Sequence, residues 1–289
     1  MQHTAPDARV SESVQAANRS LDQDGGAERA RVPAVARAAQ ILRWVSTRSS
    51  PVSLTEIAEA LRLPKSSALA ICRTLVEERL LEREAGSGGY RLGAQIIALS
   101  HAYVQGLDVA QVFHRVLEMV PEARDETVQL SLLDAADVVY VAKRDGTRTI
   151  PFQRIGCEAG QRLPASCSSS GRAMLARLED DRVRALYASR ALPRLTPNSP
   201  VTIEDLLVDL RRVRRRGYAV DDEAVSEGLA CVGAAVRGPE GRRPPAAVSV
   251  VLFRARLNGD AEHRLGALVC TMADRLAEQM GQSTPAPHC

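Results

Sequence analysis

The chain contains 289 residues, of which 45% are hydrophobic and 25% charged, and its formal net charge is +3. This is an ordinary soluble composition in a chain long enough for two domains and a sizeable core. No apolar run approaches the roughly 20 residues that span a bilayer, and residues 1–7 lack the charged and apolar regions of a signal peptide, so we expect a cytoplasmic protein.

Periodicity and composition divide the chain into five segments. We expect a disordered tail over residues 1–31, a winged helix-turn-helix domain over 32–93, a linker helix over 94–108, an α+β domain over 109–281 and a second disordered tail over 282–289. The positive excess lies in residues 32–93, which hold 9 basic and 6 acidic residues, whereas residues 94–289 hold 25 and 24. Neutralised phosphates drive most nucleic-acid affinity, so this small excess favours DNA contact that is weak for a single copy.

The second segment carries a DNA-reading pattern. A helix is predicted over residues 33–47, and Ser53 with Glu56 forms a capping box that begins a second helix. Pro64 suits the first position of a third helix that runs to about Glu78. The predicted buried stripes are Leu54, Ile57, Ala58 and Leu61 on the second helix and Ala68, Ile71, Cys72 and Leu75 on the third. Two short helices joined by a tight turn are typical of proteins that insert the last helix into the major groove.

A hairpin follows this pattern directly. Residues 80–84 and 90–92 predict two short strands around the glycine-rich tip 85–89, which is typical of a wing. The residues that we expect to face DNA are Ser53, Lys65, Ser66, Ser67, Leu69, Ala70, Arg73, Tyr90 and Arg91. The alternative is a helical hairpin and β-turn inside an unrelated core, because helix-turn-helix patterns are weak evidence alone.

The helix predicted over residues 94–105 is apolar for a connecting segment. It can therefore pair between subunits, and we expect a homodimer or a dimer of dimers, which multiplies the phosphate contacts on double-stranded operator DNA. A further helix is predicted over residues 109–123.

The remaining residues alternate strands and helices, which predicts an α+β sheet domain. Strands are predicted at 127–133, 138–142, 148–155, 219–220, 231–236 and 246–253, and helices at 173–178, 181–189, 203–216 and 260–280. The arginine-rich run 210–216 is interpreted as a solvated helix face, with a second nucleic-acid patch as the alternative.

Three groups of motifs resemble the IclR family of bacterial transcriptional regulators. They are 54–58 with 63–67 and 90–93; 160–165 with 171–173; and 216–223 with 227–229, 231–232 and 247–250. They occur in family order and cover residues 32–281. The resemblance implies an N-terminal, mainly α winged helix-turn-helix domain, a linker helix and a C-terminal α+β GAF-like domain that binds a small-molecule effector.

The stretch from Arg162 to Arg172 looks especially like the regulators of aromatic-acid catabolism in the β-ketoadipate pathway. Two departures stand out. Leu69 and Ala70 occupy recognition-helix positions that are often polar, which favours apolar contact with thymine methyls. Val251 stands two residues after Ser249, at a position where family members often have a serine. This departure removes one polar anchor from the expected ligand site and leaves the identity of the effector open.

The expected effector is a small organic acid, and the resemblance to the aromatic-acid regulators favours an aromatic carboxylate.

 The apolar walls are assigned to Phe152, Ile155 and Leu163, which suit the ring of such a ligand. Cys167, Ser168, Ser169 and the amides at the start of the following helix supply donors, and a helix start favours an anion. By resemblance, the other side of the site is lined by Asp221, Cys231, Ser249 and Val251. For each serine the alternative is that it only caps the helix.

Neither a metal nor another cofactor is expected. None of the six cysteines forms a Cys-x-x-Cys pair, and the five histidines have no metal-ligand spacing. An enzyme that uses Cys167 or a neighbouring serine as nucleophile is a weaker alternative, because no Gly-x-Ser-x-Gly elbow occurs. A ligand-free architectural DNA-binding protein is another alternative, against which the long second domain argues. Thermal-shift measurements with small carboxylates distinguish these classes, since a ligand that binds only the folded state stabilises it.

Overall fold

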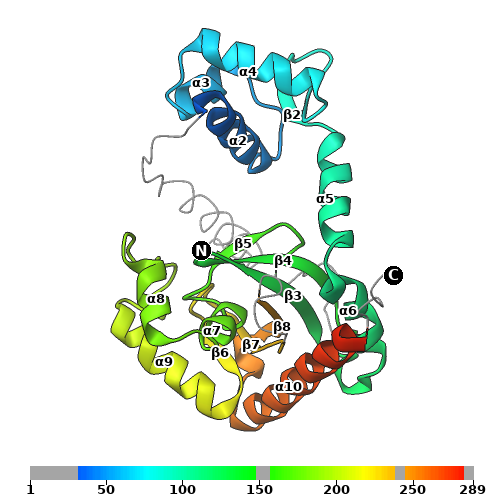
Figure 1. The fold of residues 1–289 in the computed structure, drawn as a ribbon, viewed down its shortest axis with the longest axis vertical. Coiled ribbons are helices and arrows are strands. Elements are labelled where there is room, and N and C mark those ends of the chain that lie inside the picture. Colours follow the sequence, from blue (N-terminus) through cyan, green and yellow to red (C-terminus); the bar gives the residue numbers. More distant parts are fainter. Residues whose placement is uncertain (1–31, 148–156, 238–244, 283–289) are drawn as a thin grey trace, which may run out of the picture. The chain divides into compact units, whose positions relative to one another are not determined.

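The computed structural model describes residues 32–147, 157–237 and 245–282. The chain forms two compact units that divide between Gly106 and Leu107, and each is described by itself (Figure 1). Within the described residues, no helix is long and apolar enough to cross a membrane. The strand predicted at 148–155 lies outside the described residues.

The first unit contains the predicted helices and hairpin. Its elements are α2 (Pro33–Ser46), α3 (Leu54–Ala60), α4 (Lys65–Glu77), β1 (Leu81–Arg83), β2 (Tyr90–Leu92) and α5 (Gln95–Gln105). Ser53 and Glu56 form the predicted capping box at the start of α3. Pro64 is the residue that precedes α4, one position earlier than expected. Of the stripe predicted on α4, Ala68, Cys72 and Leu75 are buried, and Ile71 is partly buried at its edge.

The hairpin is anchored to the helices by a third short segment. Val52 and Tyr90 exchange two backbone hydrogen bonds of 2.9 and 2.7 Å. At the tip, Gly86 and Gly88 have φ values of +105° and +67°, which side chains rarely adopt. The hairpin therefore begins and ends at defined positions directly behind α4, which is the arrangement of a wing.

The second unit is built on a six-stranded sheet with the order β5-β4-β3-β8-β7-β6. The strands are β3 (Thr127–Asp134), β4 (Asp137–Arg144), β5 (Arg162–Pro164), β6 (Ala219–Asp222), β7 (Leu229–Ala235) and β8 (Ala246–Phe253). All neighbouring pairs are antiparallel, in agreement with the predicted α+β class. The short edge strand β5 was not predicted, because three residues are too few to show an alternating pattern.

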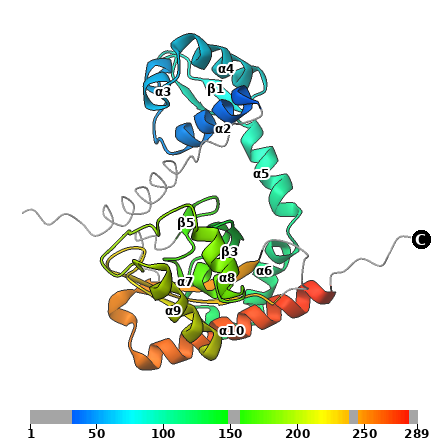
Figure 2. The ribbon, with the colours of Figure 1, turned by 60° about the vertical axis from the view of Figure 1, so that its left-hand side comes forward.

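Helices cover both faces of this sheet (Figures 1 and 2). They are α6 (Asp108–Glu118), η1 (Pro121–Ala123), α7 (Ser169–Leu175), α8 (Asp180–Tyr187), α9 (Ile203–Arg216), η2 (Arg254–Arg256) and α10 (Gly259–Gln282). Both α7 and α10 pack against the length of β7, so they occupy opposite faces, with α6 beside α10 and α9 beside α7. The helix predicted from Ala173 begins four residues earlier, because Ser168 caps it. The helix predicted over 109–123 ends at Glu118, ahead of Pro121.

The arginines of α9 are held largely by their own domain. Arg214 contacts Asp180 at 2.7 Å, and Arg211 lies 3.6 Å from the same carboxylate. Arg216 reaches Glu262 at 3.1 Å. These ion pairs support the interpretation of the run as a solvated helix face.

Candidate nucleic-acid interface and ligand site

The outer face of α4 presents uncommitted polar groups. Lys65, Ser66 and Arg73 are exposed, and the described part of the chain gives none of them a hydrogen bond or an ion pair. Ser67 and Leu69 are partly buried beside them, and all five lie off the buried stripe of the helix. The Lys65 ammonium, the Arg73 guanidinium and the Ser66 hydroxyl are thus free to contact phosphates or base edges.

Alanine occupies the centre of this face. Ala70 is exposed, and its carbonyl oxygen accepts a 3.3 Å hydrogen bond from the Thr74 hydroxyl. Its methyl group, with the partly buried Leu69 side chain, offers apolar contact to thymine methyls. The structure therefore brings the predicted α4 residues together on one surface.

Three other residues predicted to face DNA already have roles within the domain. The Ser53 hydroxyl accepts from the Glu56 amide at 3.2 Å, as the cap of α3. Arg91 is paired with Glu82 across the hairpin, with a distance of 2.6 Å between Nε and Oε1. Tyr90 is only 5% exposed and packs in the core.

Sequence reasoning missed Arg83 of the wing. Its Nε donates to the Gly88 carbonyl at 3.0 Å, and its guanidinium lies 6.0 Å from the centre of the Tyr90 ring. Arg83 therefore holds the tip of the wing in shape. The signal in the sequence was a cation at the end of the first strand, directly before the glycine-rich tip.

In the second unit, strand register places the predicted ligand residues on one face of the sheet. Asp221 pairs with Cys231, and Cys231 pairs with Val251. Two residues further along β7, Gly233 pairs with Ser249, and Ser249 pairs with Gln129 of β3. Directly opposed residues point to the same side of an antiparallel sheet. Asp221, Cys231 and Val251 therefore form one row across the sheet, and Gly233, Ser249 and Gln129 form the adjacent row.

The start of α7 rests on these rows. A Cβ atom built on Gly233 would lie 3.1 Å from the Ser169 hydroxyl oxygen and 3.1 Å from the Ser170 backbone nitrogen. The start of α7 therefore lies against β7 in the row that contains Ser249, and the row of Asp221, Cys231 and Val251 is adjacent to it. Cys231 is partly exposed, whereas Ser249 and Val251 are buried.

Cys167 and Ser168 have partners inside the protein. The Ser168 hydroxyl accepts from the Gly171 amide at 3.1 Å, which is the capping role given above as the alternative. The Cys167 thiol donates to the Pro193 carbonyl at 3.3 Å. Burial raises the pKa of this thiol, which is opposite to the depressed pKa of an activated nucleophile.

Asp221 is the ionisable group at the centre of the face, and it is 2% exposed. Its Oδ1 accepts from the Ala224 amide at 2.7 Å. Burial raises the pKa of Asp221 from its ordinary value of 3.8 to about 6, although the nearby Arg172 guanidinium opposes the shift. Arg172 donates to Asp209 at 2.8 Å and to the Val220 carbonyl at 2.9 Å, and so it ties α7 to α9 and β6.

Tyr140 and Gln129 extend this face, and sequence reasoning missed both. Gln129 Nε2 donates to the Cys157 carbonyl at 2.7 Å. Tyr140 pairs with Ser131 on the same side of the sheet, and burial, followed by the neighbouring Cys157 and Cys231, raises its pKa. The alternation of the β4 sequence contained the signal, because Tyr140 shares a face with the buried Val138.

The apolar walls are only partly described. Leu163 lies on β5, is 3% exposed and pairs with Val138. Phe152 and Ile155, which were also predicted to contact the ligand, lie outside the described residues. Within the part of the chain that the structure describes, no group of three His, Cys, Asp or Glu side chains could hold a metal ion.

Comparisons with known proteins agree with this architecture. Residues 101–278 match the family described as Bacterial transcriptional regulator IclR C-terminal, and residues 34–85 match the IclR helix-turn-helix domain. The HTH-type transcriptional regulator Rv1719 of Mycobacterium tuberculosis is 34% identical over 246 residues, which cover 82% of this chain and 89% of the relative.

Solved structures show the same fold. An IclR transcriptional regulator from Alicyclobacillus acidocaldarius is 27% identical, with a TM-score of 0.74 and coverage of 87% of this chain and 100% of that one. An IclR homologue from Microbacterium hydrocarbonoxydans, solved in complex with 4-hydroxybenzoate, is 22% identical, with a TM-score of 0.70 and coverage of 86% and 100%. The chain therefore belongs to the IclR family of DNA-binding transcriptional regulators.

Proposed function

We propose that this regulator reads its operator with the outer face of α4 and is controlled by a small organic acid bound against the α7 face of the sheet. The observation that carries the proposal is that Asp221, Cys231 and Ser249 share one face of the sheet, against which the start of α7 packs at Gly233. A buried carboxyl, a partly exposed thiol and serine hydroxyls beside apolar side chains match the composition of a small-molecule site. The protein works in the cytoplasm, where its DNA lies.

The operator contacts are assigned to Lys65, Ser66, Ser67 and Arg73, with Leu69 and Ala70 on apolar base edges. The support is their position off the buried stripe and the lack of competing partners for the two cations among residues 32–147, 157–237 and 245–282. Arg91 contributes less in this proposal, because Glu82 already neutralises its guanidinium.

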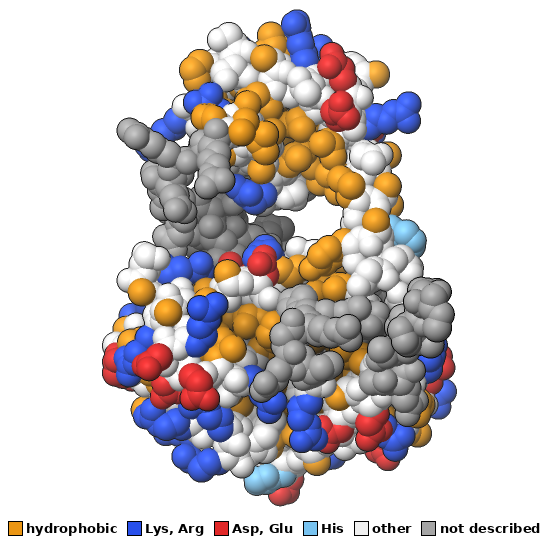
Figure 3. Space-filling view, viewed as in Figure 1, with side chains coloured by type: hydrophobic (Ala, Val, Ile, Leu, Met, Phe, Trp, Pro, Cys, Tyr) orange, Lys and Arg blue, Asp and Glu red, His pale blue; other side chains and the backbone are white. Residues whose placement is uncertain are grey.

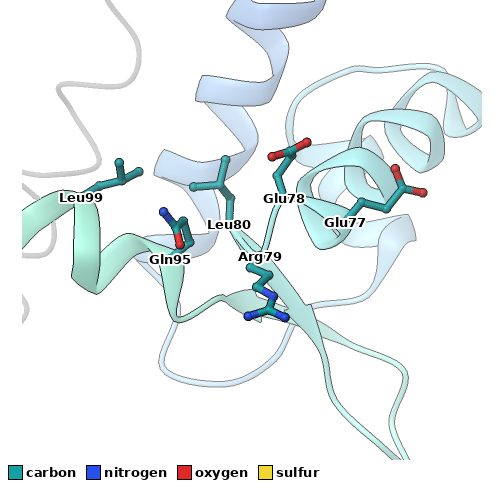
Figure 4. Close-up of a pocket in the computed structure, with 6 residues that line it drawn as sticks. All are labelled: Glu77, Glu78, Arg79, Leu80, Gln95 and Leu99. Carbon is teal, nitrogen blue, oxygen red and sulfur yellow. The ribbon is translucent and has the colours of Figure 1, made fainter.

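The functional form is proposed to be a homodimer or a dimer of dimers. The first unit exposes large apolar side chains, which gather over α2 and along α5 (Figure 3). They are Val32, Val35, Ile97, Leu99 and Tyr103, each more than half exposed. A surface hollow of about 440 Å³ lies beside them, where α4 ends and α5 begins (Figure 4), and it is lined by Glu77, Glu78, Arg79, Leu80, Gln95 and Leu99. Apolar patches of this kind mark interfaces, so a second copy is the proposed occupant.

The proposed effector class is a carboxylic acid with an aromatic ring. The relative from Microbacterium hydrocarbonoxydans holds 4-hydroxybenzoate, a member of this class. The amides at the start of α7 suit a carboxylate, whereas an ionised Asp221 repels one. Because the pKa of Asp221 is about 6, the site accepts an anion most readily when this carboxyl is protonated.

Regulation rather than catalysis is proposed for this site. Cys167 is buried, and its raised pKa keeps the thiol protonated. A ligand can change operator affinity only through its different affinity for the two states of the protein, and a coupling of about 1–3 kcal/mol is typical.

The experiment is a two-part titration of the purified full chain. Calorimetry with benzoate, 4-hydroxybenzoate and benzamide first tests the carboxylate, since benzamide keeps the ring without the charge. Gel shifts on the promoter-proximal operator, with and without the acid that binds, then test control. The proposal predicts that an acid binds, benzamide does not, and the acid changes operator affinity by about 5- to 150-fold. Binding of benzamide alone contradicts the effector class.

A further inference from the structure

A buried serine between α8 and α9 has every hydrogen-bonding position in use. Ser199 is 3% exposed. Its hydroxyl oxygen accepts from the backbone amides of Leu195 and Thr196, each at 3.0 Å. The same hydroxyl donates to the Ala224 carbonyl at 2.7 Å. A hydroxyl has one donor and two acceptor positions, so Ser199 is fully committed to joining two loops.

Two neighbours of Ser199 repeat this contact. The Thr196 hydroxyl donates to the Glu223 carbonyl at 2.7 Å, and the Asn198 amide donates to the Asp222 carbonyl at 3.2 Å. Three side chains thus bind three consecutive carbonyls that directly follow Asp221. We call Thr196, Asn198 and Ser199 the 196–199 clamp.

The clamped segment needs external support. It follows β6, which is an edge strand and is hydrogen-bonded to the sheet only through β7. Glu223 has a φ of +59°, a left-handed conformation that costs energy for a residue other than glycine. The clamp therefore stabilises a backbone that would otherwise relax.

The segment matters because it holds Asp221. The backbone of Ala224 accepts from Ser199 through its carbonyl and donates through its amide to Asp221 Oδ1 at 2.7 Å. The loop that carries the clamp also contacts the opposite side of the candidate ligand site, where Cys167 donates to the Pro193 carbonyl at 3.3 Å. Residues 193–199 thus connect both sides of the site.

We infer that Ser199 is a positioning residue of the ligand site: through Ala224 it fixes the carboxyl group of Asp221 and thereby sets the affinity for the effector. This inference rests on the proposed function. Ser199 contacts no ligand itself. Its effect passes through the backbone of one residue, Ala224, to the ionisable side chain of the site.

Protonation of Asp221 gives a readout that a purely structural role does not change. The groups that act on this carboxyl are Arg172 from α7, the neighbouring Asp222 and the amides of Ala224 and Val225; Tyr140, Cys157, Cys167 and Cys231 sense its charge in turn. The Ala224 amide favours the ionised form. Loosening this amide therefore moves the protonation midpoint of Asp221 upward.

The test compares the full-length parent with Ser199→Ala, each with and without Asp221→Asn. Melting temperatures are measured between pH 4.5 and 8, and the difference between each pair isolates the titration of Asp221. The expected result is a midpoint about half a pH unit or more higher in the Ser199→Ala pair. Affinity for benzoate and 4-hydroxybenzoate at pH 7 is expected to rise about threefold, because a larger fraction of Asp221 is then protonated and no longer repels the anion.

Two further variants keep the test decisive. Thr196→Val removes the contact with Glu223 together with the 3.1 Å hydrogen bond that the Thr196 hydroxyl accepts from the Asn198 backbone amide, and it leaves Ser199 in place. It is expected to shift the midpoint in the same direction by less, even if Ser199→Ala does not fold. Ser226→Ala is the matched control, because Ser226 is 3% exposed between β6 and β7 and, within the described parts of the chain, its hydroxyl reaches only the Glu227 carbonyl, at 3.5 Å. It is expected to leave the midpoint unchanged.

The outcomes separate the two proposals. An unchanged midpoint in the Ser199 and Thr196 variants overturns the inference, while acid binding by the parent still supports the proposed function. A shifted midpoint with unchanged acid affinity also overturns it, because Asp221 then lies outside the ligand site. If the parent binds neither acid, the effector class fails, and the role of Ser199 fails with it.

Discussion

Gly233 lies directly beneath the Ser169 side chain, and a Cβ atom at Gly233 would be 3.1 Å from the Ser169 hydroxyl oxygen. The backbone of Ser170 is equally close, so a rotation of one side chain does not relieve the contact. This relationship sets the distance between α7 and β7. A large residue at Ser169 would collide with the sheet, and variants that probe the ligand site are better placed elsewhere.

Gly233→Ala is therefore expected to destabilise the second unit by about 1–3 kcal/mol, the usual effect of overpacking a close contact. Denaturant unfolding followed by circular dichroism measures this loss. Gly259→Ala is the matched control, since a Cβ atom there meets nothing within 4 Å and its φ is not positive. Equal stabilities of the two variants would show that α7 can move away from β7 freely.

Arg73→Ala is expected to weaken operator binding by about 1–3 kcal/mol if Arg73 reads a base, with relaxed specificity at one position. If Arg73 contacts a phosphate instead, affinity falls by a similar factor for all DNA sequences. The slope of log affinity against log salt concentration then decreases by about one. Gel shifts at several salt concentrations distinguish the two.

The matched control for Arg73 is Arg115→Ala, which removes an exposed arginine from α6 in the other unit. Lys65→Ala is expected to resemble Arg73→Ala. Unchanged affinity in the Lys65→Ala, Arg73→Ala double variant contradicts the assignment of the α4 face to DNA.

Ile97→Glu is expected to weaken self-association, because Ile97 is 73% exposed on α5 and a charge there opposes burial between copies. Light scattering at micromolar concentration measures the change in mass. Ala98→Glu, at an exposed neighbouring position on the same helix, controls for charge alone. A parent protein that is monomeric and still binds its operator fully would contradict the proposed oligomer.

Much of the fold could be predicted from local patterns. The bounds 203–216 of α9 and 246–253 of β8 agree with the structure, because each has strong periodicity and a clear end. For α9, the Thr202 hydroxyl caps the first turn and Gly217 adopts a φ of +88° after the last. Short elements without periodicity, such as β5, were not predictable in this way.

The candidate ligand site was predictable only in part. The motifs identified Asp221, Cys231 and Ser249, but the neighbours Tyr140 and Gln129 meet them only through pairing across several strands. Register of this kind depends on long-range contacts that a single sequence does not display. Ser199 lies in a loop with no periodic signal, and only its hydrogen bonds show its connection to Asp221.

Asp221 is expected to make stability depend on pH. Its folded pKa of about 6 lies above its ordinary value of 3.8, so its contribution is fully present below pH 3.8 and is lost as pH rises through 6. The loss amounts to about 3 kcal/mol, since one pKa unit corresponds to about 1.4 kcal/mol. Denaturant unfolding at pH 5 and 7.5 captures about 1.4 kcal/mol of this loss, because the rest falls below pH 5. Asp221→Asn is expected to remove this part of the slope. An identical slope in parent and variant contradicts the raised pKa.

A substitution at Cys231 tests whether the effector binds on this face of the sheet. Cys231 is the partly exposed member of the row that also contains Asp221 and Val251. Cys231→Leu enlarges a side chain on the proposed ligand face and is expected to abolish acid binding. Operator affinity without acid is expected to stay within about twofold, because Cys231 belongs to the second unit and the residues assigned to DNA belong to α4 of the first. Cys270→Leu makes the same substitution at a partly exposed site on α10 and serves as the control. The measurements are calorimetry with the acid that binds the parent and gel shifts with and without it. A Cys231→Leu variant that responds to the acid like the parent would place the effector away from this face, even though the DNA-binding assignment would stand.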